Sequence, residues 1–385
     1  MVVIGGGIGG LTTAHALHRE GIPVRVFETA PHLGNVGKGI WIPPNGLAVM
    51  DRLGLLPRVV SRGIELQRVV VEHVQEGILW EIDGGALRKA TGNTILSIRR
   101  SELHRVLSVT LPERILALGK RGVRVGQCER RGWVVFEDGT RAEGDGVVVA
   151  DGIHSSTRTA LFPEAQVRET GIICFLGISP FVLDDPFTAR EIWDGRKRFG
   201  FSAVDRTHVY WYAPFRNHGD PPGPPFRSFL LDLYRNFPSP VPQMLDSTPE
   251  TEILETRLRE LSTLRTWTRG RIVLLGDAAH AMTPNLGQGG AQAMEDAFVL
   301  AKALSESRSL KEAFHMYEKQ RMPRVRRIKR SSRLVGNLAH MESRLLQRLV
   351  LRAIRLTPKA VHHRQMLWVF KGAPGRHLQY REDKG

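Results

Sequence analysis

Apolar residues form three short uninterrupted runs, at residues 2–4, 146–150 and 272–275, and a glycine follows each run within two residues. Runs of this length, rich in β-branched residues, are typical of buried parallel strands. The first run leads through GGGIGG into helical spacing at residues 11–20 and then into a second apolar run at residues 24–27. This order of strand, glycine turn, helix and strand predicts a βαβ unit.

The remaining pattern predicts further elements that are not arranged as βαβ units. Residues 64–82 alternate and predict two strands, residues 123–138 predict a hairpin, and residues 172–214 are β-rich with many aromatic residues. Helices are predicted at residues 102–111, 226–237 and 291–304. A further helix is predicted to end at residue 53, with Asn45 as its N-cap. Residues 251–264 are predicted to form an ordered connection.

We therefore expect an α/β protein with a Rossmann-like domain on a parallel sheet, a smaller domain with a mixed β-sheet, and C-terminal helices. The boundaries follow the change of pattern. Residues 1–65, 96–170 and 265–340 are assigned to a discontinuous dinucleotide-binding domain, residues 66–95 and 171–264 to a substrate domain, and residues 341–385 to a C-terminal helical segment.

The first strand end carries a dinucleotide-binding fingerprint. Gly5, Gly7 and Gly10 are in G-x-G-x-x-G register, and Glu28 ends the second strand 18 residues after Gly10. The glycines allow a tight turn and close approach of a pyrophosphate, whose charge the helix N-terminus stabilises. Glu28 can accept hydrogen bonds from ribose hydroxyls and would repel a 2′-phosphate, so FAD or NAD is expected here and NADP is not.

The other two strand ends carry carboxylates. One is Asp151-Gly152, and the other is Gly276-Asp277, followed by Pro284, Gly287, Gly289 and Gly290 before the helix at residues 291–304. Carboxylates at the ends of parallel strands point to one long ligand across the carboxyl edge of a sheet. The alternative is a structural turn in which the glycines only relieve strain.

Charge and composition widen the choice of partners. The chain has 385 residues, a formal net charge of +16 and two cysteines, Cys128 and Cys174, without metal-ligand spacing. Reduced thiols, no signal peptide and no membrane-spanning apolar run are expected, which favours the cytoplasm. Residues 319–333 contain eight Lys or Arg, and residues 345–356 are amphipathic and basic. This segment fits a solvated helical face, docking on a membrane surface, or nucleic-acid contact.

With these motifs in family order, the chain resembles the single-component FAD-dependent aromatic hydroxylases, which include para-hydroxybenzoate, salicylate, kynurenine and urate hydroxylases and zeaxanthin epoxidase. The matching segments are GGGIGG with Glu28, VVVADGIHSSTR, and LLGDAAHAMTPNLGQGG. Pro44-Asn45, Arg100-Ser101 and the run Tyr317-Glu318…Arg321…Arg324 also match. No second G-x-G-x-x-G is present, which fits a family without a separate NAD(P)H domain.

The resemblance implies roles for the matching residues. Gly5, Gly7 and Gly10 would hold the FAD pyrophosphate and Glu28 the adenosine ribose. Arg100 would reach the flavin side. Asp151 and Gly152 would lie near the pyrophosphate, and Gly276 and Asp277 at the ribityl chain. The flavin ring would be lined by Pro284, Gly287, Gly289 and Gly290.

The substrate-binding residues are less clearly marked. Arg198 and Tyr210 are twelve residues apart, like an active-site pair of the family's urate hydroxylases. Arg198 could anchor an anionic group, and Tyr210 or His208 could act as a base towards a phenol. The urate hydroxylases carry a carboxylate where this chain has Asn285, so the match to urate is incomplete.

The implied activity is a monooxygenase without metal, in which NADH or NADPH reduces FAD and the flavin C4a-hydroperoxide transfers oxygen to an electron-rich, aromatic small molecule. Either hydroxylation or epoxidation fits. The expected partners are the small-molecule substrate and O2, and nucleic acid is not expected. Peripheral membrane contact through the basic C-terminal helices is also compatible with the sequence, and the oligomeric state is left undetermined. Two alternatives remain: a flavin-linked reductase of isoprenoid lipids, and a non-catalytic protein that binds FAD or nucleic acid.

Overall fold

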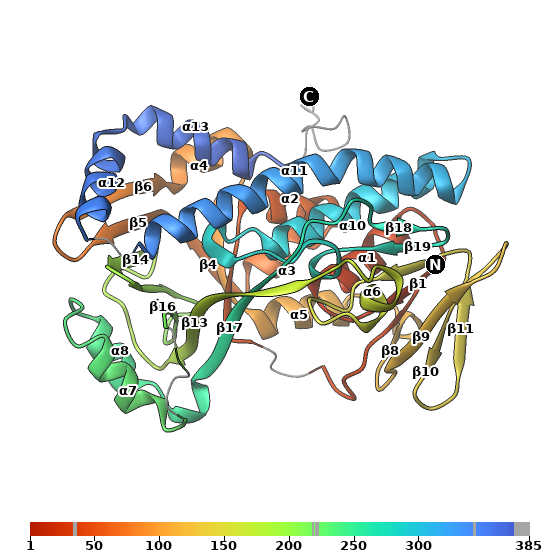
Figure 1. The fold of residues 1–385 in the computed structure, drawn as a ribbon, viewed down its shortest axis with the longest axis horizontal. Helices are drawn as coiled ribbons and strands as arrows, with labels where there is room; N and C mark the ends of the chain where they lie inside the picture. Colours follow the sequence, from red (N-terminus) through yellow and green to blue (C-terminus); the bar gives the residue numbers. More distant parts are fainter. Residues whose placement is uncertain (34–36, 218, 220–222, 342–343, 373–385) are drawn as a thin grey trace.

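Two large β-sheets organise the chain, and long helices run along one side of them (Figure 1). The structure is a computed structural model, and it describes residues 1–33, 37–217, 219, 223–341 and 344–372. The expected α/β class with a parallel sheet is confirmed. The predicted domain boundaries remain a prediction.

The six-stranded sheet has the order β18-β19-β12-β1-β2-β8, in which only β18 runs antiparallel. The strands β1, β12 and β19 are fully buried, as their continuous apolar runs predict. The strands are β1 Val2–Ile4, β2 Arg25–Phe27, β8 Leu116–Ala117, β12 Val147–Val149, β18 Thr268–Arg269 and β19 Ile272–Leu274. Helices α1 Ile8–Arg19, α5 Arg100–Val109, α10 Gly289–Glu306 and α11 Leu310–Ala339 contribute to the same core.

The seven-stranded sheet has the order β17-β13-β16-β15-β14-β5-β6 and is antiparallel except between β14 and β5. Helices α7 Phe226–Leu233 and α8 Val241–Ser247 cover one face of it. The strands are β5 Arg68–His73, β6 Gly77–Asp83, β13 Val167–Ser179, β14 Thr188–Asp194, β15 Lys197–Ala203, β16 Val209–Arg216 and β17 Leu254–Leu261.

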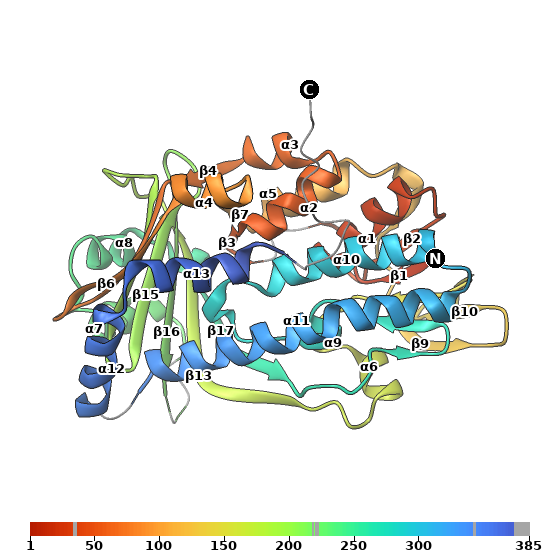
Figure 2. The same cartoon turned by 90° about the horizontal axis from the view of Figure 1, so that it is seen from above.

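Two small sheets and several short helices complete the described chain, and Figure 2 shows them from above. The sheets are β11-β10-β9 and β3-β7-β4, built from β3 Gly39–Ile42, β4 Gly63–Leu66, β7 Ile95–Arg99, β9 Gly122–Gln127, β10 Gly132–Phe136 and β11 Arg141–Gly144. The helices are α2 Pro44–Arg52, α3 Leu56–Val60, α4 Gly84–Thr91, α6 Ser156–Leu161, α9 Asp277–His280, α12 Arg344–Leu356 and α13 Lys359–Phe370, with single turns η1 Glu113–Ile115, η2 Glu250–Glu252 and η3 Pro284–Leu286.

Three local predictions are wrong. Residues 64–82 contain three strands, because β4 leaves to pair with β7 while β5 and β6 join the large sheet. The predicted connection at residues 251–264 contains strand β17, which pairs with β13. Asn45 does not cap α2, which begins at Pro44, and its side chain bonds to buried partners instead. Over the described ranges, no helix combines the length and apolar character that a bilayer crossing requires.

Candidate functional site

The three glycine-bearing motifs and Glu28 meet at one edge of the six-stranded sheet. In the parallel register, Ile4 pairs with Phe27 and with Val149, and Val149 pairs with Leu274. The residues that follow these strands therefore emerge side by side at the carboxyl edge, where open α/β sheets bind ligands.

The Glu28 carboxylate is fixed by backbone donors of the first motif. Gly6 N donates to Oε2 at 2.6 Å, and Ala30 N donates to Oε1 at 2.9 Å. The ring of His104 bonds Gly6 O at 2.6 Å from the other side. These contacts hold the glycine turn and the carboxylate in one arrangement, and further lone pairs of Glu28 remain for a ribose hydroxyl.

The glycines of the first motif have two different roles. Gly5 has a φ of +99°, and a Cβ on Gly10 would lie 1.9 Å from Gly5 O, so both positions need glycine for the turn itself. A Cβ on Gly7 would meet nothing within 4 Å. Gly7 is also the N-cap of α1, and as a glycine it has no side chain to cap the helix. The open space at this helix N-terminus is therefore suited to a pyrophosphate.

Asp151 contributes a buried acceptor without a protein partner among the described residues. Its Oδ1 is buried and makes no hydrogen bond, and burial raises the pKa of the carboxyl to about 6. Gly152 beside it has a φ of +84° and faces open space. A ligand donor at this position would relieve the unsatisfied acceptor.

The third motif presents a second helix N-terminus. Gly287 and Gly289 face open space, and the N-cap of α10, Gln288, makes no side-chain cap bond. Asp277 is exposed at the start of α9. Free N–H groups at the N-terminus of α10 would stabilise negative charge on a bound ring. Pro284 begins the η3 turn beside it, and Arg100 is exposed at the start of α5, where its backbone N donates to Lys38 O at 3.0 Å.

A buried ion network fixes α10 behind this motif. Arg321 Nε donates to Asp296 Oδ1 at 2.7 Å, and Arg324 Nε donates to Glu295 Oε2 at 2.9 Å. Asp296 also accepts from Gly276 N at 3.1 Å and bonds the ring of His280 at 2.5 Å. Burial opposes the charge on Asp296, but His280 and Arg321 beside it lower its pKa to about 2. The network therefore ties the Gly276 turn to α10 and α11.

The seven-stranded sheet presents a polar cluster on the face that α7 and α8 leave free. We call this the Glu191 cluster; its members are Glu191, Trp193, Arg198 and Tyr212. Glu191 Oε1 accepts from Trp193 Nε1 at 2.6 Å and from Arg198 NH1 at 3.2 Å, and Oε2 accepts from the Tyr212 hydroxyl. Arg198 is 2% exposed, so its ion pair is buried.

Asn285 joins the Glu191 cluster to the carboxyl edge of the six-stranded sheet, where the three motifs and Glu28 meet and which we call the cofactor edge. Arg198 NH2 donates to Asn285 Oδ1 at 2.7 Å, and Asn285 Nδ2 donates to Ser332 O at 3.0 Å. Asn285 lies in η3, within the third motif and shortly before α10. The predicted substrate residue Arg198 thus contacts the loop that would line the flavin.

Of the other two predicted catalytic residues, Tyr210 borders the Glu191 cluster, with its ring 5.9 Å from that of Tyr212, and His208 lies apart from it. Tyr210 is on the same face as Arg198, but it pairs with Ser202, four residues along β15. Burial raises the pKa of Tyr210 above its ordinary value, which opposes a role as a base. His208 lies in the turn before β16, where its Nδ1 contacts Asp205 Oδ1 at 3.1 Å. The structure does not place His208 in the Glu191 cluster.

Glu191 and Tyr212 were not predicted from the sequence. Their strands belong to a segment whose many aromatic residues suggest a hydrophobic core. One face of the sheet does form such a core, under α7 and α8, where Phe199 and Trp211 stack at 5.6 Å. Only the pairing of Glu191 with Gly200 and of Gly200 with Tyr212 brings the carboxylate and hydroxyl together. This cluster can be predicted only when the register of the paired strands is known.

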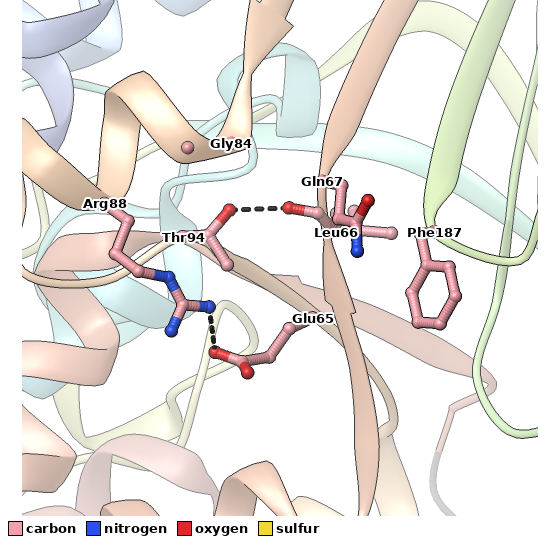
Figure 3. Close-up of a pocket in the computed structure, with 8 residues that line it drawn as sticks. Glu65, Leu66, Gln67, Gly84, Arg88, Thr94 and Phe187 are labelled. Carbon is pink, nitrogen blue, oxygen red and sulfur yellow. Dashed lines mark hydrogen bonds and ion pairs between the residues drawn. The ribbon is translucent and has the colours of Figure 1, made fainter.

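A surface pocket of about 300 Å³ lies between β4, α4 and the segment before β14, and Figure 3 shows it. The Arg88–Glu65 ion pair at 2.7 Å and the Thr94–Leu66 hydrogen bond at 2.6 Å cross its wall. None of the predicted site residues lines it. The pocket is therefore separate from the predicted site.

Comparison with known proteins supports FAD binding at the cofactor edge. A family model described as an FAD binding domain matches residues 1–332. The aurachin C monooxygenase/isomerase of Stigmatella aurantiaca is 34% identical over 349 residues, which cover 89% of this chain and 90% of that protein. The 2-heptyl-3-hydroxy-4(1H)-quinolone synthase of Pseudomonas aeruginosa is 32% identical over 379 residues, which cover 97% and 98% of the two chains.

Among solved structures, the crystal structure of Klebsiella pneumoniae HpxO complexed with FAD and uric acid matches with a TM-score of 0.89. It is 26% identical and covers 97% of each chain. A salicylate hydroxylase substrate complex matches with a TM-score of 0.79 at 22% identity, which supports the fold alone.

Proposed function

Because the chain belongs to the family of single-component FAD-dependent aromatic hydroxylases, we propose that it adds one oxygen atom to a neutral, electron-rich heteroaromatic ring of the 4-quinolone type, with NADH or NADPH as reductant. Its cofactor is FAD. When bound, FAD takes electrons from the reduced nicotinamide and activates O2. The chain's own residues supply binding, orientation and electrostatics.

The cofactor edge fits FAD residue by residue. The open space at Gly7 and the N-terminus of α1 would receive the pyrophosphate, and the fixed Glu28 would accept from the ribose. Asp151 would accept a hydrogen bond at its unpaired Oδ1. Asp277 would bond the ribityl chain, and the N-terminus of α10 would face the ring between Gly287 and Gly289. Arg100 and Pro284 would complete the flavin side.

The charge state of Arg198 carries the substrate proposal. Its guanidinium is already paired with Glu191, so the pair has no net charge to offer a carboxylate or urate anion. At Asn285 the chain has an amide in place of the carboxylate expected of a urate hydroxylase, so this position supplies no base. Both features favour a neutral ring over an acid.

The walls near the Glu191 cluster suit an aromatic ring with apolar substituents. Trp41 meets Tyr212 edge to face at a ring separation of 5.8 Å, and Trp41 Nε1 donates to Ser202 Oγ at 2.7 Å. Ile178, Tyr210 and Val204 form a buried apolar patch on the same part of the sheet. A relative named for a 2-heptyl-3-hydroxy-4(1H)-quinolone product supports the same substrate class.

The test is anaerobic reduction of bound flavin with a matched pair of compounds. We would add 2-methyl-4(1H)-quinolone or 4-quinolone-2-carboxylate, in which a carboxylate of similar size replaces the methyl group, and follow flavin bleaching by NADH and by NADPH. We expect the neutral compound to accelerate reduction at least tenfold more than the acid. Equal acceleration, or acceleration by the acid alone, would contradict a neutral substrate.

The two alternatives from the sequence gain no support. Of the two curated relatives reported above, one is named a monooxygenase and neither is named a reductase, which does not favour an isoprenoid-lipid reductase. A non-catalytic role would leave the Glu191 cluster, joined through Asn285 to the flavin loop, without a purpose.

A further inference from the structure

Helix α12 lies at one end of the molecule's long axis, in both views (Figures 1 and 2). Its inner side is packed. Leu351 is 1% exposed in a cluster with Trp193 and Leu79, and Gln347 Nε2 donates to Gly195 O at 3.1 Å. Since Trp193 donates to Glu191, α12 lies directly behind the Glu191 cluster.

The outer side of α12 exposes an apolar stripe. Leu346 is 50% exposed, Leu349 is 64% exposed and Leu356 is 83% exposed, and the small residue between them, Ala353, is also exposed. Steps of three, four and three residues place these side chains along one line on a helix. Large exposed leucines in a continuous line mark an interaction surface more than isolated ones do. We call these four residues the leucine stripe.

A basic residue borders the leucine stripe. Arg352 is exposed on α12, three residues after Leu349 and four before Leu356, whereas Arg355 lies on the side of buried Leu351 and pairs with Glu76 at 3.5 Å. The charge is regional, because residues 319–371 contain fifteen Lys or Arg and one acidic residue, Glu342. Arg321 and Arg324 are neutralised by Glu295 and Asp296, but most of the net charge of +16 still comes from this segment.

We propose that the outer face of α12 docks on an anionic lipid bilayer surface. The leucine stripe would enter the boundary between headgroups and acyl chains, while Arg352 would lie against lipid phosphates. Apolar and basic residues side by side on a helix that lies flat are the combination that such a surface binds. Nucleic acid would use the arginines but gain nothing from exposed leucines.

The position of α12 connects docking to the proposed function. A 4-quinolone with an alkyl chain partitions into bilayers, and the docked helix would hold the Glu191 cluster close to that surface. This link rests on the proposed function. The docking itself does not, because it depends only on the exposed residues of α12.

The experiment is flotation of the full-length FAD-loaded protein with vesicles of phosphatidylcholine, or of phosphatidylcholine with about one third phosphatidylglycerol. The variants are L349E, which breaks the leucine stripe, and R352E, which reverses one flanking charge. V109E and R58E make the same changes at exposed positions on α5 and α3 and serve as controls. All four positions are exposed, so folding should be kept.

We expect the protein to bind anionic vesicles at least tenfold more tightly than neutral ones. L349E should weaken binding about tenfold, and R352E about fivefold or more, since each basic residue near such a surface contributes about fivefold. The controls should bind like the unchanged protein.

Four results would overturn the proposal. The first is no flotation with anionic vesicles, and the second is equal loss in the control variants. The third is binding to a duplex DNA probe that R352E weakens and L349E does not, which would identify nucleic acid as the partner. A change of oligomeric state in L349E without any change in flotation would assign the stripe to a second copy and would also contradict lipid docking. Flavin reduction by NADH or NADPH in the presence of a soluble quinolone, measured in the same variants, should stay unchanged, so failure of docking and failure of the proposed function are separable.

Discussion

The cofactor edge of the six-stranded sheet and the free face of the seven-stranded sheet are built in different ways. At the cofactor edge, each functional group directly follows a strand, and the parallel register brings the strand ends together. On the free face, the Glu191 cluster is assembled from alternate residues of β14, β15 and β16. The first arrangement is encoded locally, and the second depends on which strands pair and in which register.

Two sequence neighbours show the contrast within one strand. Trp211 packs on the core face, where its ring stacks with Phe199 at 5.6 Å and its Nε1 donates to Thr248 Oγ1 at 3.0 Å. Tyr212 points to the other face, and its hydroxyl bonds Glu191. A strand alternates its side chains, so one residue serves stability and the next serves the site.

The largest expected effect separates these two neighbours. W211A should lower the free energy of unfolding by about 4 kcal/mol, because it empties a fully buried aromatic site. Y212F should lower it by about 1.5 kcal/mol, because only a hydrogen bond to a carboxylate is lost. Urea denaturation of both variants measures this. A larger loss in Y212F would show that the faces are assigned the wrong way round.

At the cofactor edge, Gly10 and Gly7 separate a role in stability from a role in binding in the same way. G10A should lower the free energy of unfolding by about 3 kcal/mol, because its Cβ would lie 1.9 Å from Gly5 O. G7A adds a Cβ where the free protein has open space, so the apoprotein should keep its stability while FAD affinity falls about 100-fold. Thermal unfolding of apoprotein and FAD titration test this pair. Unchanged FAD affinity in G7A would mean that the open space is not the pyrophosphate site.

A smaller effect is expected at Glu191, and it should spare the cofactor. E191Q leaves the Arg198 guanidinium with its full charge, so kcat/KM for the neutral quinolone should fall about tenfold and that for the matching carboxylate should rise. FAD affinity should not change. Steady-state NAD(P)H oxidation with each compound measures this, with E143Q at the exposed Arg141–Glu143 pair as the control. A parallel fall for both compounds would contradict the charge argument.

The smallest effect is a pH dependence at Asp151. Its pKa is raised to about 6 by burial, so the stability that its neutral form gives the free protein is present below about pH 4 and lost as pH rises through 6. FAD that donates to the ionised carboxylate should bind about tenfold more tightly at pH 7.5 than at pH 5. D151N should bind FAD with little pH dependence over this range. A slope that persists in D151N would assign the titration to another group.

Much of the fold could be predicted from sequence, and the reason is local. The apolar runs at β1, β12 and β19 and the glycine turn before α1 are short-range signals, and the structure contains these elements. The strand β17 was read as a connection because its leucines, Leu254, Leu258 and Leu261, do not follow the period of two that is typical of a strand, and it becomes a strand only by pairing with β13. Asn45 was read as a cap because nothing local shows its bond to Glu295, 250 residues away.

The same reasoning explains the outcome at the substrate face. Arg198 stood out because its spacing from Tyr210 resembles an active-site pair of the urate hydroxylases, but its partner Glu191 lies in another strand and Asn285 in another sheet's loop. His208 stood out by its residue type alone, and the structure places it beside Asp205 in a turn. Side-chain chemistry suggested candidates, and strand register decided which of them meet.

The most direct test of the central claim is the fate of molecular oxygen. The FAD-loaded protein would be supplied with NADH or NADPH, 2-heptyl-4(1H)-quinolone and ¹⁸O2, and the mass of the product would be measured by mass spectrometry. The account predicts one ¹⁸O atom in the ring product and one reduced nicotinamide consumed for each product formed. Flavin that cycles with release of hydrogen peroxide only, in the presence of any neutral quinolone tested, would contradict it.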